Sequence, residues 1–165
     1  MTQKLIIIRG NSGSGKSTVA KRLQGEMGRG TMLIPQDMVR RDILKVLDTP
    51  GNESIDMIYE MALYGHKIGY DVIVEGILHE KKYGDMLRKL LNDFQGEVTV
   101  YYLDIPFEET LRRHATKSNA HEYGEKEMRE WWIDKDYLGV EGEIILSDER
   151  SEDDLVKAIM LKLQP

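Results

Sequence analysis

The sequence predicts an α/β fold in which a five-stranded parallel sheet lies between two layers of helices. Short apolar, β-branched runs recur along the chain, as expected for strands buried on both faces of a sheet. Segments with helical periodicity separate these runs, and strands that alternate with helices form right-handed βαβ units with parallel strands. The chain has 165 residues, so we expect residues 1–165 to form a single domain.

The apolar runs predict five strands, at residues 5–8, 32–34, 72–74, 98–103 and 144–146. Helical periodicity predicts seven helices, at residues 17–27, 38–47, 55–68, 81–94, 107–114, 125–136 and 152–163. The last helix has the clearest start, because Ser151 can cap it and Asp154 stands three residues later. Two stretches, 48–54 and 118–124, contain turn residues and are predicted to be loops.

The overall charge argues against partners that bind basic surfaces. The formal net charge is -6 and the pI is about 5.3, whereas nucleic acids and anionic membranes gain affinity from excess Lys and Arg. The chain has no cysteine, which rules out a disulfide framework and thiolate metal sites. Its first apolar run, residues 5–8, is too short for a signal peptide or a membrane span. We therefore expect a soluble, cytoplasmic protein that does not bind membranes, and its charge argues against broad binding to nucleic acid. Its oligomeric state is left open.

One motif points to a specific chemistry. Residues 10–17 read Gly-Asn-Ser-Gly-Ser-Gly-Lys-Ser and match the Walker A pattern G-x-x-x-x-G-K-S/T in full. The match lies between a predicted buried strand and a predicted amphipathic helix, which is the context that its mechanism needs. A purely structural turn fits poorly with three glycines and a lysine in one loop. The motif therefore predicts a site for a nucleoside triphosphate.

Each part of this loop has an expected role. The glycines let backbone N–H groups turn toward phosphate oxygens at the positive end of a helix. Lys16 is expected to reach the β- and γ-phosphates and Ser17 to bind Mg²⁺, while Thr18 either contacts the α-phosphate or only caps the helix. The residues predicted to bind the nucleotide are Gly10, Asn11, Ser12, Gly13, Ser14, Gly15, Lys16, Ser17 and Thr18.

Motifs beyond the loop indicate the nucleotide and the kind of protein. No Asn-Lys-x-Asp guanine-recognition motif follows the later strands, and the chain lacks room for the extra elements of large ATPases, so ATP is expected. The chain resembles the small P-loop kinases, particularly the group with the polynucleotide 5′-hydroxyl kinase domain, zeta-toxin kinases and chloramphenicol phosphotransferase. The resemblance rests on Ile34-Pro35-Gln36-Asp37-Met38-Val39-Arg40, on Ile73-Val74-Glu75-Gly76, and on Leu103-Asp104-Ile105-Pro106 followed by Leu111-Arg112-Arg113. It implies a P-loop kinase fold with a short helical lid at about residues 115–136.

The first of these motifs implies the residues that act on the acceptor. In such kinases an Asp-x-x-Arg at this place supplies the base and a neighbouring arginine, which here are Asp37 and Arg40. Asp37 follows a predicted strand, so it should project from the carboxyl edge of the sheet, where ligands of open α/β folds bind. It could instead only cap the following helix. Arg40 lies one helical turn later on the same face, and Arg41 is its main rival.

The second and third motifs place carboxylates at later strand ends. An isolated buried carboxylate is costly unless it is paired or lies near a metal, so Glu75 is expected either to contact Mg²⁺, through water, or to make a structural hydrogen bond. For Asp104 a structural role is expected rather than a contact with the metal, because it stands before Pro106 and a predicted helix. We expect it to be a capping residue.

Cations at the start of the predicted lid complete the site. Arg113 and Lys117 stand where such kinases carry cations that close over ATP and neutralise charge in the transition state. The family pattern has a second arginine where this chain has Lys117, and lysine lacks the bidentate fork of arginine. Arg112 or Arg129 could supply that guanidinium instead. His79 and His121 are expected to be polar loop residues, and one of Trp131 and Trp132 is expected to pack in the core.

These observations predict an ATP-dependent kinase that uses Mg²⁺ and phosphorylates a hydroxyl group of a small molecule, such as a nucleoside, a nucleotide, a sugar or a drug-like alcohol. Catalysis would depend on Lys16, Asp37, Arg40, Arg113 and Lys117, with Ser17 and Glu75 at the metal. Two alternatives remain open. One is a nucleotide-responsive ATP-binding protein that gates a partner, and the other is a polynucleotide 5′-hydroxyl kinase.

Overall fold

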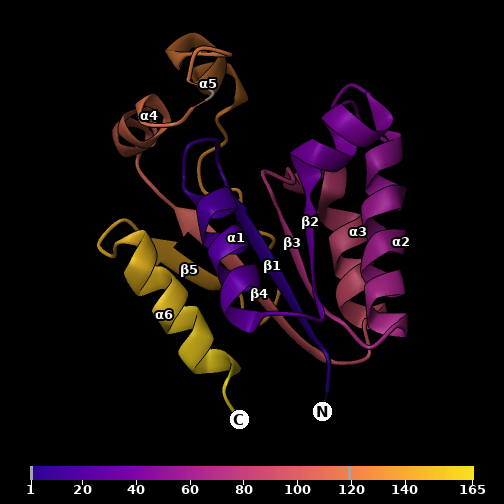
Figure 1. The fold of residues 1–165 in the computed structure, drawn as a ribbon. Helices are drawn as coiled ribbons and strands as arrows, with labels where there is room; N and C mark the ends of the chain where they lie inside the picture. The colour runs from indigo at the N-terminus through magenta and orange to yellow at the C-terminus, as the bar shows by residue number, and fades with distance from the viewer. Residues whose placement is uncertain (1, 119) are drawn as a thin grey trace.

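The strands form one parallel sheet, as the sequence predicts. In a computed structural model, which describes residues 2–118 and 120–165, five strands pair in the order β2-β3-β1-β4-β5, and every neighbouring pair is parallel (Figure 1). The strands are β1 (Lys4–Gly10), β2 (Thr31–Pro35), β3 (Asp71–Gly76), β4 (Glu97–Asp104) and β5 (Ile144–Ser147). The central place of β1 agrees with its continuous run of buried residues.

Helices cover both faces of the sheet, which confirms the three-layer α/β/α fold (Figure 1). On one face lie α1 (Lys16–Met27) and α6 (Glu152–Leu163), and on the other lie α2 (Glu53–Lys67) and α3 (Glu80–Asp93). The three remaining helices stand beyond the carboxyl ends of the strands: η1 (Met38–Leu44), α4 (Phe107–Ala115) and α5 (Glu125–Trp131). Ser151 caps α6 as predicted, since its hydroxyl accepts a hydrogen bond from Asp154 N at 3.1 Å.

Alternate residues of β1 enter two separate cores. Leu5 and Ile7 pack with residues of α2 and α3, whereas Ile6 and Ile8 pack with residues of α1 and α6. All four side chains are at most 1% exposed. Successive side chains of a strand point to opposite faces, so a sheet covered on both faces requires apolar residues at every position. Within the described residues, no helix is both long and apolar enough to cross a bilayer.

The register of the sheet brings the predicted site residues to one edge. Gly10 at the end of β1 pairs with Leu103 of β4, while Glu75 of β3 pairs with Ile8 of β1 on one side and with Pro35 of β2 on the other. In parallel strands these carboxyl ends meet at the same edge. The phosphate loop, Glu75 and the segment after Pro35 therefore converge there.

Two segments around η1 differ from the prediction. The helix predicted at 38–47 is a π-helix that ends at Leu44, where the chain turns through Lys45 with φ of 53° and Val46 N donates to Arg40 O. The loop predicted at 48–54 ends earlier, because the Asn52 side chain accepts a hydrogen bond from Ser54 N at 3.0 Å and starts α2 at Glu53. Short π-helical segments are frequent at functional sites.

The helix predicted at 125–136 ends at Trp131. The backbone of Ile133 instead makes two hydrogen bonds to the side chain of Asn11 in the phosphate loop, at 2.7 and 3.1 Å. These tertiary bonds replace the helical ones that a longer α5 would have made. Periodicity along the chain could not show this competing partner.

Candidate active site

Residues 10–17 form a loop between β1 and α1, the context that the Walker A motif requires. Gly13 and Gly15 have φ of 80° and 93°, values that favour glycine. A Cβ atom on Gly13 would stand only 2.6 Å from the carbonyl oxygen of Thr110. Gly13 is therefore required both for the turn of the loop and for its close packing against α4.

Three predicted residues meet at the base of this loop. The Lys16 side chain is 8% exposed and its Nζ donates to the carbonyl oxygen of Asn11 at 3.2 Å. The Ser17 hydroxyl donates to a carboxylate oxygen of Glu75 at 3.1 Å, and Glu75 is 5% exposed. The structure thus brings Glu75 to the hydroxyl that the sequence analysis assigned to Mg²⁺.

Burial disfavours the charged forms of the side chains in this cluster. Burial raises the pKa of Glu75, against the opposing effects of Lys16 and of the hydrogen bond from Ser17. Burial likewise lowers the pKa of Lys16, and Glu75 and Asp37 counter this shift. The pKa of Lys117 is also lowered by burial, and Glu75 counters it. The four side chains therefore form one cluster of mutually dependent charges at the sheet edge.

Asp37 occupies the first position before η1 but makes no side-chain cap hydrogen bond. Its carboxylate is 65% exposed and lies 3.9 Å from Nη2 of Arg40. Arg40 is held in place by a hydrogen bond from its Nη1 to the carbonyl oxygen of Val46 at 3.1 Å. Asp37 is thus free of a structural capping bond and faces a fixed cation.

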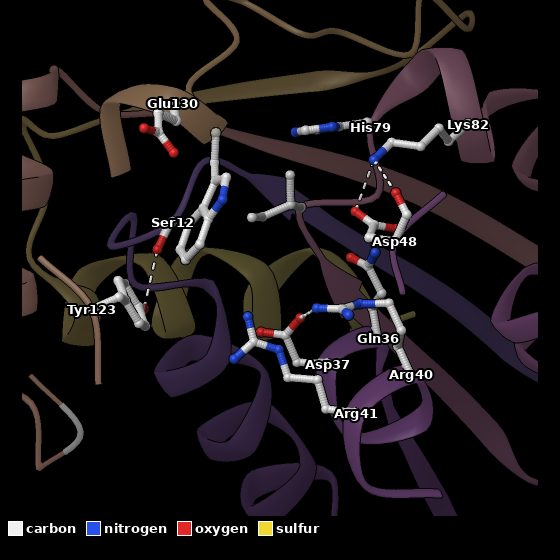
Figure 2. Close-up of a pocket in the computed structure, with 12 residues that line it drawn as sticks. Ser12, Gln36, Asp37, Arg40, Arg41, Asp48, His79, Lys82, Tyr123 and Glu130 are labelled. Atoms are coloured by element: carbon white, nitrogen blue, oxygen red, sulfur yellow. Dashed lines mark hydrogen bonds and ion pairs between the residues drawn. The ribbon is translucent and has the colours of Figure 1, made fainter. Parts of the chain in front are cut away.

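A cavity of about 430 Å³ opens beside Asp37 (Figure 2). Its walls come from the phosphate loop, the start of η1, the loop after β3 and α5, segments far apart in the sequence. Lys82 and Asp48 on its wall form an ion pair, with Lys82 Nζ 2.9 Å from the Asp48 carboxylate. The same carboxylate also accepts a hydrogen bond from the Tyr83 hydroxyl. The cavity is lined by Ser12, Gln36, Asp37, Arg40, Arg41, Asp48, Ile77, His79, Lys82, Tyr123, Glu130 and Trp131.

A second cavity, of about 520 Å³, is lined by other residues of the loop and of α1. Arg113 lies at its edge, where Nη1 donates to the carbonyl oxygen of Ser14 at 2.7 Å and Nε donates to Glu109 at 3.0 Å. The lining residues are Gly15, Thr18, Arg22, Arg112, Arg113, Thr116, Lys117, Ser151, Glu152 and Asp153. The two cavities share no residue, and the phosphate loop contributes to both.

A family model described as an AAA domain matches residues 5–132, which is well over half of the chain. The chain belongs to this AAA domain family. The match includes the phosphate loop, Asp37, Glu75, Arg113 and Lys117. A search of curated proteins finds no match in sequence.

Solved kinases share the fold of this AAA domain protein along nearly the whole chain. The APS kinase CysC of Mycobacterium tuberculosis, solved with AMPPNP and APS, is 22% identical with a TM-score of 0.74, and 99% of each chain is covered. A gluconokinase from Sinorhizobium meliloti 1021 is 15% identical with a TM-score of 0.61, again over 99% of each chain. A sugar kinase from Janibacter sp. is 18% identical with a TM-score of 0.62, over 98% of this chain and 94% of its own. The fold is therefore that of the P-loop kinases, as the sequence predicts.

The segment after α4 is tied to the phosphate loop by side chains that the Walker A pattern leaves unspecified. Asn11 pairs with both backbone groups of Ile133, and the Ser12 hydroxyl lies 3.2 Å from the hydroxyl of Tyr123. The Tyr123 ring stacks on His114 at 4.4 Å. Sequence analysis assigned Asn11 and Ser12 only to the nucleotide, because the motif does not show what their side chains contact.

The Asn11→Ala variant should loosen this segment without unfolding the sheet. The substitution leaves the backbone N–H and C=O of Ile133 without their partner, at a cost of about 1–3 kcal/mol if no water replaces it. Hydrogen exchange at residues 120–133 should therefore be faster than in the wild type, while exchange in β1 and β4 stays unchanged. Asn92→Ala, on exposed α3 surface, is the matched control. Unchanged exchange at 120–133 would show that Asn11 does not hold the segment.

Arg9, which no sequence motif singles out, is 0% exposed in the centre of the sheet. Its guanidinium donates to the carbonyl oxygen of Leu78 and lies 2.9 Å from the Asp136 carboxylate. Asp136 in turn accepts from Glu80 N at the start of α3. Arg9 therefore joins the loop after β3 to the end of the 115–136 segment. A charged residue directly after an apolar strand was the available signal, since a buried cation needs a partner.

Two expectations about single residues are wrong. Asp104 does not cap α4; Pro106 occupies that position, and Asp104 accepts from the Tyr137 hydroxyl at 2.9 Å. Neither tryptophan packs in the core, because α5 stands beyond the sheet: Trp131 lines the first cavity and Trp132 packs edge-on against Phe107.

The other candidates are divided between the site and the surface. Arg112 pairs with Glu109 and lines the second cavity, whereas Arg129 pairs with Glu125 on the exposed side of α5. His79 lines the first cavity. His121 is exposed and lines neither of the two cavities.

Proposed function

We propose that this protein is an ATP-dependent kinase that transfers the γ-phosphate of ATP to a hydroxyl group of a small molecule. The observation that carries the proposal is the pair of cavities that meet at the phosphate loop, with Asp37 in one and Thr18, Arg113 and Lys117 in the other. A protein that only hydrolyses ATP needs one such cavity. The APS kinase of the same fold was solved with both AMPPNP and APS, which supports a donor site and an acceptor site here.

The second cavity is the proposed donor site. Backbone N–H groups of Gly13 to Ser17 would surround the phosphates at the amino end of α1, and Lys16 would neutralise the β- and γ-phosphates. Thr18 would lie at the α-phosphate and the nucleoside would extend toward Arg22 and Ser151. Arg113 and Lys117 would hold the charge that develops on the transferred group.

The first cavity is the proposed acceptor site. Asp37 accepts the proton of the acceptor hydroxyl, whose oxygen forms a bond to the γ-phosphorus. The bond from that phosphorus to the β,γ-bridging oxygen breaks, and ADP leaves with the electron pair. Arg40 orients Asp37 from 3.9 Å. Because Asp37 is exposed, it can return the proton to water after ADP is released.

The residues at the loop base also fit Mg²⁺. Ser17 and Glu75 offer the hard oxygen ligands that this ion prefers, and a site with one hydroxyl and one carboxylate leaves room for water and phosphate oxygens. Burial raises the pKa of Glu75, because it disfavours the charged carboxylate, and a nearby positive charge would favour that form. When bound, the ion would draw charge from the β- and γ-phosphates.

Replacing Glu75 separates its role at the site from its effect on stability. We expect Glu75→Gln to lower kcat at limiting Mg²⁺ by roughly 10- to 100-fold, as for outer ligands of metal sites. The same change should raise the free energy of unfolding at pH 7.5. Glu75 has a folded-state pKa above the ordinary 4.5, so the folded state binds more protons between the two pKa values, and wild-type stability falls as pH rises through that window.

The measurement is urea unfolding of both proteins at pH 4.5 and pH 7.5, together with Mg²⁺ titrations of kcat. The stability advantage of Glu75→Gln should grow from the lower pH to the higher one. Glu97→Gln, at the opposite edge of the sheet, is the control for loss of one carboxylate. If Glu75→Gln had the same Mg²⁺ dependence of kcat as the wild type, Glu75 would not be part of the metal site.

A screen of hydroxyl compounds tests the proposed function directly. Nucleosides, nucleotides, sugars and antibiotics are incubated with the protein and MgATP, and acceptor-dependent release of ADP is measured. We expect at least one compound class to raise ADP release well above the level with water. ADP release that no hydroxyl compound changes, with capture of a partner only in the presence of ATP, would favour a nucleotide-responsive binding protein instead. The cavity of about 430 Å³ supports a small acceptor rather than a polynucleotide end.

A further inference from the structure

The polar groups that line the first cavity differ in whether they have hydrogen-bond partners among the described residues. Arg41 is exposed, and among the residues that the structure describes its guanidinium makes no hydrogen bond or ion pair; Figure 2 shows this side chain pointing into the cavity. Nε of Arg40 and Nε2 of His79 are buried, and within the same described residues neither has a hydrogen-bond partner. Burial lowers the pKa of His79, so its ring is neutral at neutral pH. A neutral imidazole carries a single N–H, so Nε2 of His79 donates in one tautomer and accepts in the other. Within the described residues, the unpaired donors of the cavity are therefore those of Arg40 and Arg41.

The acceptor groups of the cavity are mostly committed. Both oxygens of Asp48 are bonded, one to Lys82 and the other to Tyr83, and the side-chain oxygen of Gln36 accepts from Leu78 N at 2.8 Å. In the proposed reaction, Asp37 accepts the proton of the acceptor hydroxyl. On the η1 wall the side-chain groups without a partner among the described residues are the guanidinium nitrogens of Arg41 and Nε of Arg40, so a ligand group that binds at this wall should be an oxygen acceptor.

The charges lie on different walls. Arg40 and Arg41 come from η1, whereas Glu130 comes from α5 (Figure 2). Among the described residues its carboxylate makes no ion pair or side-chain hydrogen bond. An anionic group is therefore attracted to the η1 wall and repelled from the α5 wall. This arrangement gives the cavity one preferred orientation for a ligand with a single negative end.

We propose that the acceptor is a small anionic hydroxyl compound, with a carboxylate or phosphate that binds Arg41 next to the hydroxyl that Asp37 deprotonates. Asp37 and Arg41 come from the same short segment, the start of η1, and both line this cavity. The planar fork of arginine suits both kinds of oxyanion. Glu130 and the ring of Trp131 then face the uncharged, hydroxylated end. The proposal rests on the proposed kinase function only for the identity of the reacting hydroxyl.

Matched pairs of compounds test this inference. Each pair has the same hydroxylated chain with and without the anion: D-gluconate with D-glucitol, D-glycerate with glycerol, and D-ribose 5-phosphate with D-ribose. Acceptor-dependent ADP release gives kcat/KM for each compound. Calorimetric titration in the presence of a non-hydrolysable ATP analogue gives its Kd without any turnover, and the analogue keeps the anion out of the phosphate loop.

In the wild type we expect the anionic member of at least one pair to bind about 10- to 100-fold more tightly than its neutral partner, as one or two charge-assisted hydrogen bonds allow. Arg41→Gln should abolish this preference, Arg41→Lys should retain part of it, and affinity for the ATP analogue should stay within about twofold. Arg29→Gln removes the same charge from the exposed amino end of the sheet and should leave the preference intact.

The outcomes separate the two proposals. Anion preference in binding that depends on Arg41, without any ADP release, would support the oxyanion site and contradict the kinase function. ADP release with neutral compounds that Arg41→Gln leaves unchanged would support the kinase function and overturn the oxyanion site. If Arg41→Gln lost affinity equally for the anionic and the neutral member of a pair, the oxyanion site would also be overturned, because the loss would show a general defect of the cavity.

Discussion

The Asp37→Asn variant should lose about 10²- to 10⁴-fold in kcat, the usual contribution of a general base, while its affinity for ATP stays unchanged. The amide keeps the shape of the side chain but cannot take up the acceptor proton. Stability should hardly change, because Asp37 is 65% exposed and its side chain makes no capping hydrogen bond. Steady-state kinetics with an acceptor from the screen, calorimetric titration with ATP and thermal unfolding measure the three quantities.

Asp42→Asn is the matched control for this variant, since it removes an exposed carboxylate from the same helix outside the cavity. It should retain wild-type kcat. If Asp37→Asn also retained turnover, Asp37 would not be the base. If it instead lost stability by about 1 kcal/mol, as loss of a helix cap does, its role would be structural.

The Lys16→Met variant should lose about 10²- to 10³-fold in kcat/KM for ATP, the scale for removal of one preorganised group that stabilises the transition state. Methionine keeps the length and burial of the side chain but removes the charge that faces the phosphates. Lys21→Met, exposed on the same helix, should retain activity. Full activity in Lys16→Met would contradict the proposed donor site.

Stability distinguishes loss of chemistry from loss of fold in Lys16→Met. The folded-state pKa of Lys16 lies below the ordinary 10.5, so the unfolded state binds more protons between the two values. Wild-type stability should therefore rise with pH in that window relative to Lys16→Met. Urea unfolding at pH 7 and pH 10 measures this difference. A variant that is folded at both values but inactive would place the defect in the site.

The fold was predictable because its signals are local. The apolar run of β1 required burial on both faces, and the motif that follows it required a strand before and a helix after. Helix limits were less predictable where a distant group competes for the backbone. The end of α5 depends on Asn11, which is 122 residues from Ile133, and no pattern near Trp131 shows that bond.

The site was predictable in part. The sequence analysis singled out Asp37 and Glu75 because each follows a predicted strand, and the carboxyl ends of parallel strands meet at one edge. It missed Arg9 and gave Asn11 only a nucleotide contact. Both side chains act through partners in the 115–136 segment, Asp136 and Ile133. From the sequence, Arg41 is only an alternative to Arg40. In the structure, Arg40 donates a hydrogen bond to Val46, whereas Arg41 points into the cavity.

The phosphate loop and the three-layer fold can be predicted from residue types at fixed spacing within short segments. Three properties are visible only in the folded chain: which charges are buried together, how Asn11 holds the backbone of Ile133, and where a cavity with unpaired donors opens beside Asp37. Those properties depend on distances between residues far apart in the chain, and spacing along the sequence does not determine such distances.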